Sequence, residues 1–194
     1  MKNPRVTIDD VLAWEPCAKY THERVKAIFG RKKYLTAADI ARLKILPEDK
    51  VWALCHAPFM ARRTAVAFAV IRAESVLSVY KTACPGDGRV ENCLRVARRW
   101  LRGEGTQQQL RAAYAAAFVA ASAASAYAAY ASAASAYAAY AAYAADAAYA
   151  AAYAAANWAA AYADAAGNRE GSLRLAVEII AAGEEAAVAM ALNK

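Results

Sequence analysis

The sequence predicts an all-α protein, a multi-helix bundle wrapped around one very long helix rich in Ala and Tyr. Three observations support this prediction. Between Gly105 and Gly167, no Gly or Pro interrupts a segment composed mostly of Ala, the residue with the highest helix propensity. Elsewhere, apolar residues recur at helical spacing between capping residues and Gly or Pro breaks. No segment shows the strict apolar and polar alternation of a half-buried strand.

The Ala/Tyr segment, residues 106–166, would form a helix about 90 Å long if it were continuous, at about 1.5 Å per residue. Six of its polar residues fall on one narrow stripe, whereas its aromatic residues spread over the other faces; the six are Ser125, Ser132, Ser135, Asp146, Asn157 and Asp164. A helix that is apolar on nearly all sides is buried. We therefore expect the rest of the chain, or a second subunit, to surround it. A bend or break into two antiparallel helices, near 131–136 or Asn157, is the alternative.

Capping signals place a series of shorter helices in the N-terminal half. Thr7 and Asp10 predict a capping box that opens a helix ended by Pro16, and Thr36 and Asp39 predict a second box. Between these two helices, another runs from Cys17 or Thr21 to Phe29, where Gly30 stops it. A fourth helix starts at Pro47 and ends near Pro58.

The remaining elements follow from the positions of Gly and Pro. We expect a long amphipathic helix from Phe59 to Cys84, a turn at 85–88, and a helix over 90–101 ended by Gly103. Beyond the Ala/Tyr segment, the glycines at 167 and 171 predict a turn, after which Ser172 caps a final helix. We treat 1–105, 106–166 and 167–194 as three parts of one structural unit.

Charge is distributed unevenly along the chain. The formal net charge is +7, and residues 1–106 hold 20 Lys and Arg against 11 Asp and Glu, whereas the remainder holds 4 against 6. A basic surface favours acidic partners such as a nucleic acid, a nucleotide or an acidic protein face, although it can also serve only solubility. The N-terminus lacks the apolar stretch of a signal peptide, and we expect a cytoplasmic protein. The uncharged run at 112–145 contains too few strongly apolar residues to predict a membrane span.

The reactive residues do not form a recognisable catalytic or metal-binding pattern. We expect the four cysteines, Cys17, Cys55, Cys84 and Cys93, to be free buried thiols, although the last two could meet across the loop between them. No CxxC pair and no suitably spaced His predicts a metal site or a cofactor. His22 and His56 also lack a nucleophile and an acid in a catalytic order. We therefore predict that the chain is not an enzyme.

Several short motifs occur in order before the Ala/Tyr segment. They are Trp52-Ala-Leu, the run from Ala61 to Ala69, Ala73-Glu74-Ser75-Val76-Leu77 with Tyr80, Pro85-Gly86-Asp87 with Arg89, and the run from Ala97 to Glu104. Together with the aromatic-studded Ala tail, and with an opening that contains Asp9, Asp10 and Pro16-Cys17, they resemble the Imm-5-like family of immunity proteins. The resemblance implies a helical protein of bacteria or phages that neutralises a toxin or effector. It implies no set of functional residues.

Arginines provide the best candidate site. Arg95, Arg98, Arg99 and Arg102 share one face of one predicted helix. The full candidate set adds Arg62, Arg63 and the tyrosines Tyr127, Tyr130, Tyr137 and Tyr140. Guanidinium groups bind phosphate in a bidentate manner, and Tyr rings stack on bases. The set favours a pocket for an anionic nucleotide-like ligand or a patch for an acidic protein. The alternative is internal pairing of Arg98 or Arg99 with Glu74, Asp87 or Glu91.

These observations favour a non-enzymatic binding protein that neutralises a toxin or defence effector, of the immunity or phage anti-defence type. Two alternatives remain open. One is sequestration of a small anionic nucleotide-like signal in the Arg and Tyr pocket, and the other is nonspecific nucleic-acid binding by the basic N-terminal half. The excess of apolar surface on the Ala/Tyr segment also predicts a homo-oligomer.

Overall fold

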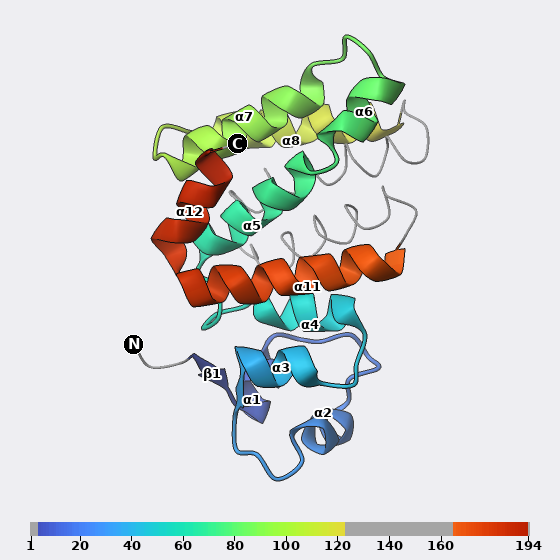
Figure 1. Ribbon diagram of the computed structural model, residues 1–194, viewed down its shortest axis with the longest axis vertical. Coiled ribbons are helices and arrows are strands. Elements are labelled where there is room, and N and C mark those ends of the chain that lie inside the picture. Colours follow the sequence, from blue (N-terminus) through green and yellow to red (C-terminus); the bar gives the residue numbers. More distant parts are fainter. Residues whose placement is uncertain (1–3, 123–164, 194) are drawn as a thin grey trace.

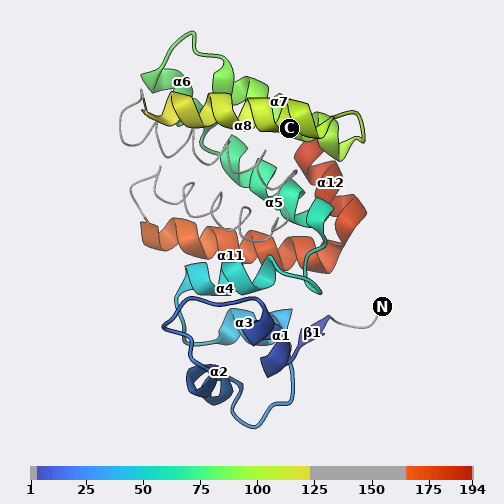
Figure 2. The ribbon, with the colours of Figure 1, turned by 180° about the vertical axis from the view of Figure 1, so that it is seen from behind.

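The computed structural model describes residues 4–122 and 165–193, which form ten helices and one short two-stranded sheet. The helical content confirms the predicted all-α class. Helices α6, α7 and α8 lie at one end of the elongated molecule, and α5, α12, α11 and α4 follow in turn toward the other end (Figure 1). Helices α1 to α3 and the sheet form the opposite end, which the reverse view shows in the same order (Figure 2).

That opposite end is the N-terminal module, residues 4–46. It contains β1 (Arg5–Val6), α1 (Ile8–Ala13), α2 (His22–Phe29), β2 (Leu35–Thr36) and α3 (Ala37–Arg42). The two strands pair antiparallel, with Val6 opposite Leu35. The expectation of no strand is therefore wrong. Strands of two residues are too short to produce a period-two pattern, so no sequence signal marks them.

Both predicted capping boxes are present in this module. The Asp10 backbone N–H donates to Thr7 Oγ1 (3.2 Å), and the Thr7 backbone N–H donates to the Asp10 carboxylate (2.7 Å). Thr36 and Asp39 make the same pair of bonds, at 3.2 and 3.0 Å. Each strand thus leads directly into a capped helix start.

The predicted helix over 59–84 is two helices, α5 (Arg62–Glu74) and α6 (Leu77–Ala83), which follow α4 (Pro47–Leu54). The break lies at Ser75 and Val76. The Ser75 hydroxyl donates to the Ile71 carbonyl (2.8 Å), and the Val76 N–H bonds to Ala73, only three residues back (3.2 Å). Such local side-chain bonding competes with the regular helical pattern and bends the chain.

Helix α5 lies at the centre of the described residues. From Thr64 to Ile71 every residue is buried, and α5 packs against α7, α11 and α12. By contrast, α8 (Gln107–Ser122), the described start of the Ala/Tyr segment, buries one face with Leu110, Ala113, Ala117 and Ala120 against α7 (Arg89–Leu101). The very long helix, and the alternative bend within it, otherwise lie outside the described residues and stay predictions.

The C-terminal region differs from the predicted turn followed by one helix. Helix α11 (Ala165–Ala182) runs through the glycines at 167 and 171, and the break comes instead at Gly183, before α12 (Glu184–Leu192). Gly183 has φ +88°, which favours glycine. Each interior glycine costs about 1 kcal/mol of helix stability. Burial of Leu173, Ala176 and Ile179 in the core offsets that cost.

The four cysteines are free thiols. Cys55 and Cys93 are buried, as expected, whereas Cys84 is half-buried and Cys17 is exposed. The expectation of buried thiols is therefore wrong for Cys17. This residue lies in the exposed connection between α1 and α2, where no core element covers it.

Candidate functional site

The six candidate arginines come from two neighbouring helices. Arg62 and Arg63 begin α5, and Arg95, Arg98 and Arg99 lie along α7, with Arg102 at its C-cap. Helix α7 buries Val90, Cys93, Leu94, Val96, Ala97 and Leu101 on its other side. This amphipathic division follows from helical spacing and leaves the arginines on the outward side of α7, where α12 approaches them.

Arg98 connects three helices. Its guanidinium forms an ion pair with Glu74 of α5 and also donates to the carbonyl oxygen of Ala191 in α12 (3.0 Å). Both side chains of the ion pair are mostly buried, at 19% and 17% exposure. This pairing is one of the internal contacts that the sequence left open. Arg98 acts here as a brace for the fold.

Arg63 makes a second brace between the same elements. Its guanidinium donates to the Leu101 carbonyl at the end of α7 (2.8 Å) and pairs with Glu184 at the start of α12 (3.3 Å). Glu185 lies slightly farther away, at 3.6 Å. Arg63 and Arg98 therefore hold the two ends of α12 against α5 and α7.

The other four arginines have partners close to them in the chain or on a neighbouring helix, and three of them, Arg62, Arg95 and Arg102, are exposed. Arg102 and Arg99 both approach the Glu104 carboxylate, at 3.2 and 3.8 Å. Arg95 donates to the Asn92 side chain, and Arg62 lies 5.8 Å from the centre of the Trp100 ring. These side chains retain charge at the surface, but most have a nearby partner within the chain.

The predicted aromatic half of this pocket cannot be placed against the arginines. Tyr127, Tyr130, Tyr137 and Tyr140 lie outside the described residues, so the combined Arg and Tyr site stays a prediction. Within the described residues, the arginines of α5 and α7 meet carboxylates, carbonyls and one indole ring.

The Pro85-Gly86-Asp87 motif also builds the fold. The Asp87 carboxylate accepts hydrogen bonds from Tyr80 Oη (2.7 Å), from the Arg89 backbone N–H (3.0 Å) and from the Arg89 guanidinium. The Arg89 hydrogen bonds hold the pKa of Asp87 well below its usual range, whereas burial, followed by the bond to Asp87, raises the pKa of Tyr80. Near neutral pH, Asp87 therefore stays ionised and Tyr80 stays neutral, and their hydrogen bond holds the turn between α6 and α7.

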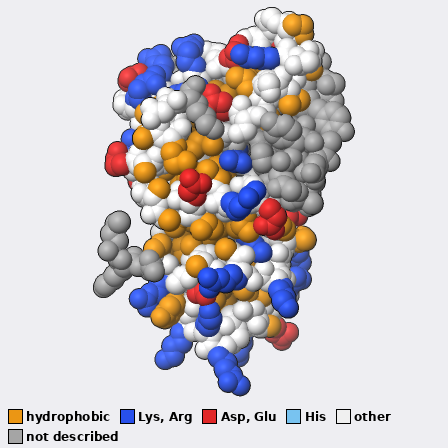
Figure 3. All heavy atoms as spheres, in the orientation of Figure 1, with side chains coloured by type: hydrophobic (Ala, Val, Ile, Leu, Met, Phe, Trp, Pro, Cys, Tyr) orange, Lys and Arg blue, Asp and Glu red, His pale blue; other side chains and the backbone are white. Residues whose placement is uncertain are grey.

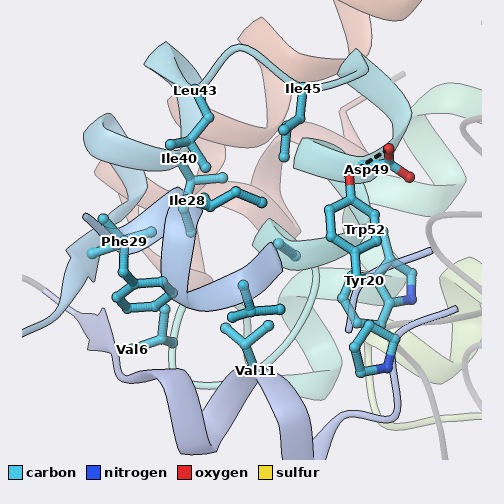
Figure 4. A pocket seen from close by; sticks show the side chains of 14 residues that line it. Val6, Val11, Tyr20, Ile28, Phe29, Ile40, Leu43, Ile45, Asp49 and Trp52 are labelled. Atoms are coloured by element: carbon cyan, nitrogen blue, oxygen red, sulfur yellow. Dashed lines mark hydrogen bonds between the residues drawn. The ribbon is translucent and has the colours of Figure 1, made fainter. Parts of the chain in front are cut away.

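A separate feature, which the sequence did not reveal, is an apolar hollow in the N-terminal module. Its volume is about 60 Å³, and side chains from both strands and from α1 to α4 line it. Figure 4 shows Val11, Ile28, Phe29 and Ile40 pointing into this space. The individual residues are ordinary apolar positions of short helices, so only their packing creates the hollow.

Polar groups stand at one side of the hollow. Tyr20 Oη donates to Asp49 Oδ2 (2.7 Å), the bond that Figure 4 draws as a dashed line, and Lys19 Nζ pairs with the same oxygen (2.9 Å). The Arg24 guanidinium lies 4.8 Å from the centre of the Tyr20 ring. Burial, followed by the bond to Asp49, raises the pKa of Tyr20, and the bond to Asp49 raises the pKa of Lys19. Tyr20 thus stays neutral and Lys19 charged at neutral pH.

His56 is not alone in the fold, although it stands alone in the sequence. Its ring stacks on Trp14 (4.6 Å between centroids) and lies 4.5 Å from the Trp52 ring, and Nδ1 donates to the Trp52 carbonyl (2.8 Å). This stack fastens the loop after α1 to α4. Among residues 4–122 and 165–193, no three His, Cys, Asp or Glu residues gather in a way that could hold a metal ion. No helix in these ranges is long and apolar enough to cross a membrane.

Comparison with known proteins agrees with the sequence motifs. Residues 59–178, well over half of the chain, match the family described as Imm-5 like putative immunity protein. The match begins at Phe59, so the similar positions before it, in the N-terminal module and α4, lie outside the matched range. No curated protein and no solved structure matches the chain. The range from α5 through most of α11 carries the family pattern, and the chain belongs to the Imm-5-like family of immunity proteins.

Proposed function

We propose that the chain protects its cell by binding a toxin or defence effector protein directly, and that it acts by occlusion and not by catalysis. Membership of an immunity-protein family supports a protective role. The single observation that supports a binding mechanism is the division of charge between the two ends of the molecule. Most charged residues of the family motifs pair with one another or with α12, whereas the N-terminal module carries several cations that have no carboxylate partner among the described residues.

Several arginines of the matched range have carboxylate partners. Arg98 pairs with Glu74 and Arg89 with Asp87, both within the range, and Arg63 pairs with Glu184 just beyond it. A partner that recruited Arg98 would leave the Glu74 carboxylate uncompensated, which is costly because both side chains are mostly buried. The braced helices α5, α7 and α12 therefore serve as a scaffold.

The cations of the N-terminal module are placed differently. Arg24, Lys26, Arg31, Lys33 and Lys44 are exposed, and none has a carboxylate within ion-pair distance in the described part of the chain. Figure 3 shows many Lys and Arg side chains projecting from this end of the molecule. Such a surface attracts an acidic protein and raises its rate of association. We therefore expect an acidic partner.

Co-expression tests this proposal. The chain is expressed beside candidate toxins and effectors, and growth is recorded together with native mass spectrometry of the tagged chain. We expect one protein that is toxic alone, that forms a complex of fixed stoichiometry with the chain, and whose own mass is unchanged on release. Rescue of growth without a complex, or release of a covalently altered partner, would refute neutralisation by binding.

The same purified sample separates the two alternatives. Denaturing extraction that releases a nucleotide would support sequestration, in which case a pure nucleotide should raise the Tm by mass action. Nonspecific nucleic-acid binding should instead weaken steeply as salt is raised, with no dependence on sequence.

A further inference from the structure

The apolar hollow and the cations around it suit one kind of ligand. We propose that the hollow receives one aliphatic side chain from an acidic segment of the toxin or effector protein. This inference rests on the proposed function for the source of that segment. It adds a contact site in the N-terminal module, which lies outside the residues that match the family.

The volume of the hollow restricts what can enter it. A cavity of about 150 Å³ holds a benzene ring, and a single water needs about 10–15 Å³ of cavity volume. At about 60 Å³, the hollow is too small for an aromatic ring and matches the branched end of a Leu, Ile or Val side chain. Its lining is apolar apart from the Tyr20 and Asp49 pair, so water gains few hydrogen bonds inside it.

The chain around the hollow supplies the charge. The basic run 31–33 connects Phe29 to Leu35, and both of these residues line the hollow. Lys44 is exposed and lies between two further lining residues. On the Tyr20 side, Lys19 and Arg24 lie near Asp49, the one acid among the lining residues. Acidic residues on either side of the inserted aliphatic side chain would therefore meet cations.

The lining residues are also held firmly enough to form a site. The paired strands and the two capping boxes fix β1, β2, α1 and α3, and the stack of His56 on Trp14 fixes the approach of α4. Each of these contacts stabilises the walls without filling the space between them. A preformed hollow of this kind binds a side chain without first reorganising.

A peptide titration tests the site without any toxin. The probe is acetyl-Glu-Asp-Leu-Asp-Glu-amide, added to methyl-labelled chain and followed by NMR, beside a peptide with Ala in place of Leu and one with Lys in place of every acid. We expect saturable shifts at the methyl groups of Val25, Ile40 and Leu43. The Ala peptide should bind about tenfold more weakly, because it buries less apolar surface, and the Lys peptide should cause no such shifts.

Two variants with matched controls locate the effect. Ala53→Leu extends a wall residue into the hollow and should abolish the preference for the Leu peptide, whereas Ala112→Leu, on an exposed face of α8, should not. Lys44→Glu should weaken binding of the acidic peptide severalfold, whereas Arg95→Glu on α7 should leave it unchanged. Thermal melts establish that each variant is folded.

Three results would overturn the inference. They are the absence of saturable shifts, equal binding of the Leu and Ala peptides, and shifts confined to α5, α7 or α8. Methyl shifts of the lining residues that grow with the concentration of the chain alone would mean that a second copy occupies the hollow, which also overturns it. Because no toxin is used, failure of this titration leaves the proposed function intact. Peptide binding by a chain that neutralises no toxin would remove only the proposed function.

Discussion

Replacement of Arg98 by Met tests whether the arginine face of α7 is a brace or an open binding surface. The substitution keeps the apolar stem and removes the ion pair with Glu74 and the bond to Ala191. Loss of one partner of a fully buried ion pair costs about 3–5 kcal/mol, and because both side chains are about one-fifth exposed we take the lower end. Glu74 Oε2 already lacks a hydrogen-bond partner among the described residues, so its carboxylate would be left largely uncompensated.

Thermal and urea unfolding measure this loss. A change of about 3 kcal/mol corresponds to a Tm lower by about 6–12 °C in a chain of this size. Arg95→Met is the matched control, since Arg95 is exposed and bonds only Asn92 in the described residues, and it should change stability by no more than about 0.5 kcal/mol. In the double variant with Glu74→Met, much of the loss should be recovered. A loss of stability no larger for Arg98→Met than for the control would refute the brace.

Three further predictions follow from local features. Gly105→Ala should destabilise the chain by about 1–3 kcal/mol, because the new Cβ would lie 3.0 Å from backbone atoms of Trp100. Gly88→Ser, in open space, should be neutral, and equal melts for the two variants would contradict the clash. The Lys32 hydrogen bond, followed by those of Thr36, lowers the pKa of Asp39 to about 2. The ionised Asp39 carboxylate therefore stabilises the fold above about pH 4, and this stabilisation is lost as pH falls toward 2. In urea melts, the difference in unfolding free energy between the parent chain and Asp39→Asn should shrink over that range. A difference that stays constant would contradict this role of Asp39. Light scattering should detect a homo-oligomer at micromolar concentration, and a monomer alone would remove that prediction.

Local signals in the sequence predicted the helix starts well. The Thr7 and Thr36 capping boxes, the start at Pro47 and the end near Gly103 depend on residues three or four apart, so short-range chemistry determines them. The two-residue strands could not be found, because their pairing joins residues about thirty positions apart in the chain. Local rules describe where a helix can begin, but not which distant segment it will meet.

The helix breaks show the limit of the Gly and Pro signals. The sequence at 167–171 contains two glycines and suggested a turn, yet α11 continues through it because its later residues are buried in the core. The break between α11 and α12 does have a local signal, because Gly183 is followed by two acids, Glu184 and Glu185, that favour a helix start. Between α5 and α6, the Ser75 hydroxyl bonds the Ile71 carbonyl where the helix breaks, although the apolar residues keep helical spacing on both sides of the break.

The candidate site was partly accessible from sequence. Helical spacing placed four arginines on one side of α7, and Glu74 was among the internal partners considered for Arg98. The bond from Arg98 to Ala191 spans 93 residues and needs α12, which the sequence merged into a longer helix. The apolar hollow arises from the shapes of packed side chains, and no spacing rule describes empty space.

The proposed division between a scaffold and a recognition surface has an energetic basis. A ligand that bound Arg98 would have to leave Glu74 without its cation, and that cost of several kcal/mol would subtract from the binding free energy. Lys33 and Lys44 have no such partner in the described residues, so an acidic ligand gains their charge without breaking an existing pair. Because exposed charges are strongly solvated, their contribution lies mainly in the association rate and in partner choice, and an apolar contact must supply most of the affinity. The hollow is a feature of the N-terminal module that can provide such a contact.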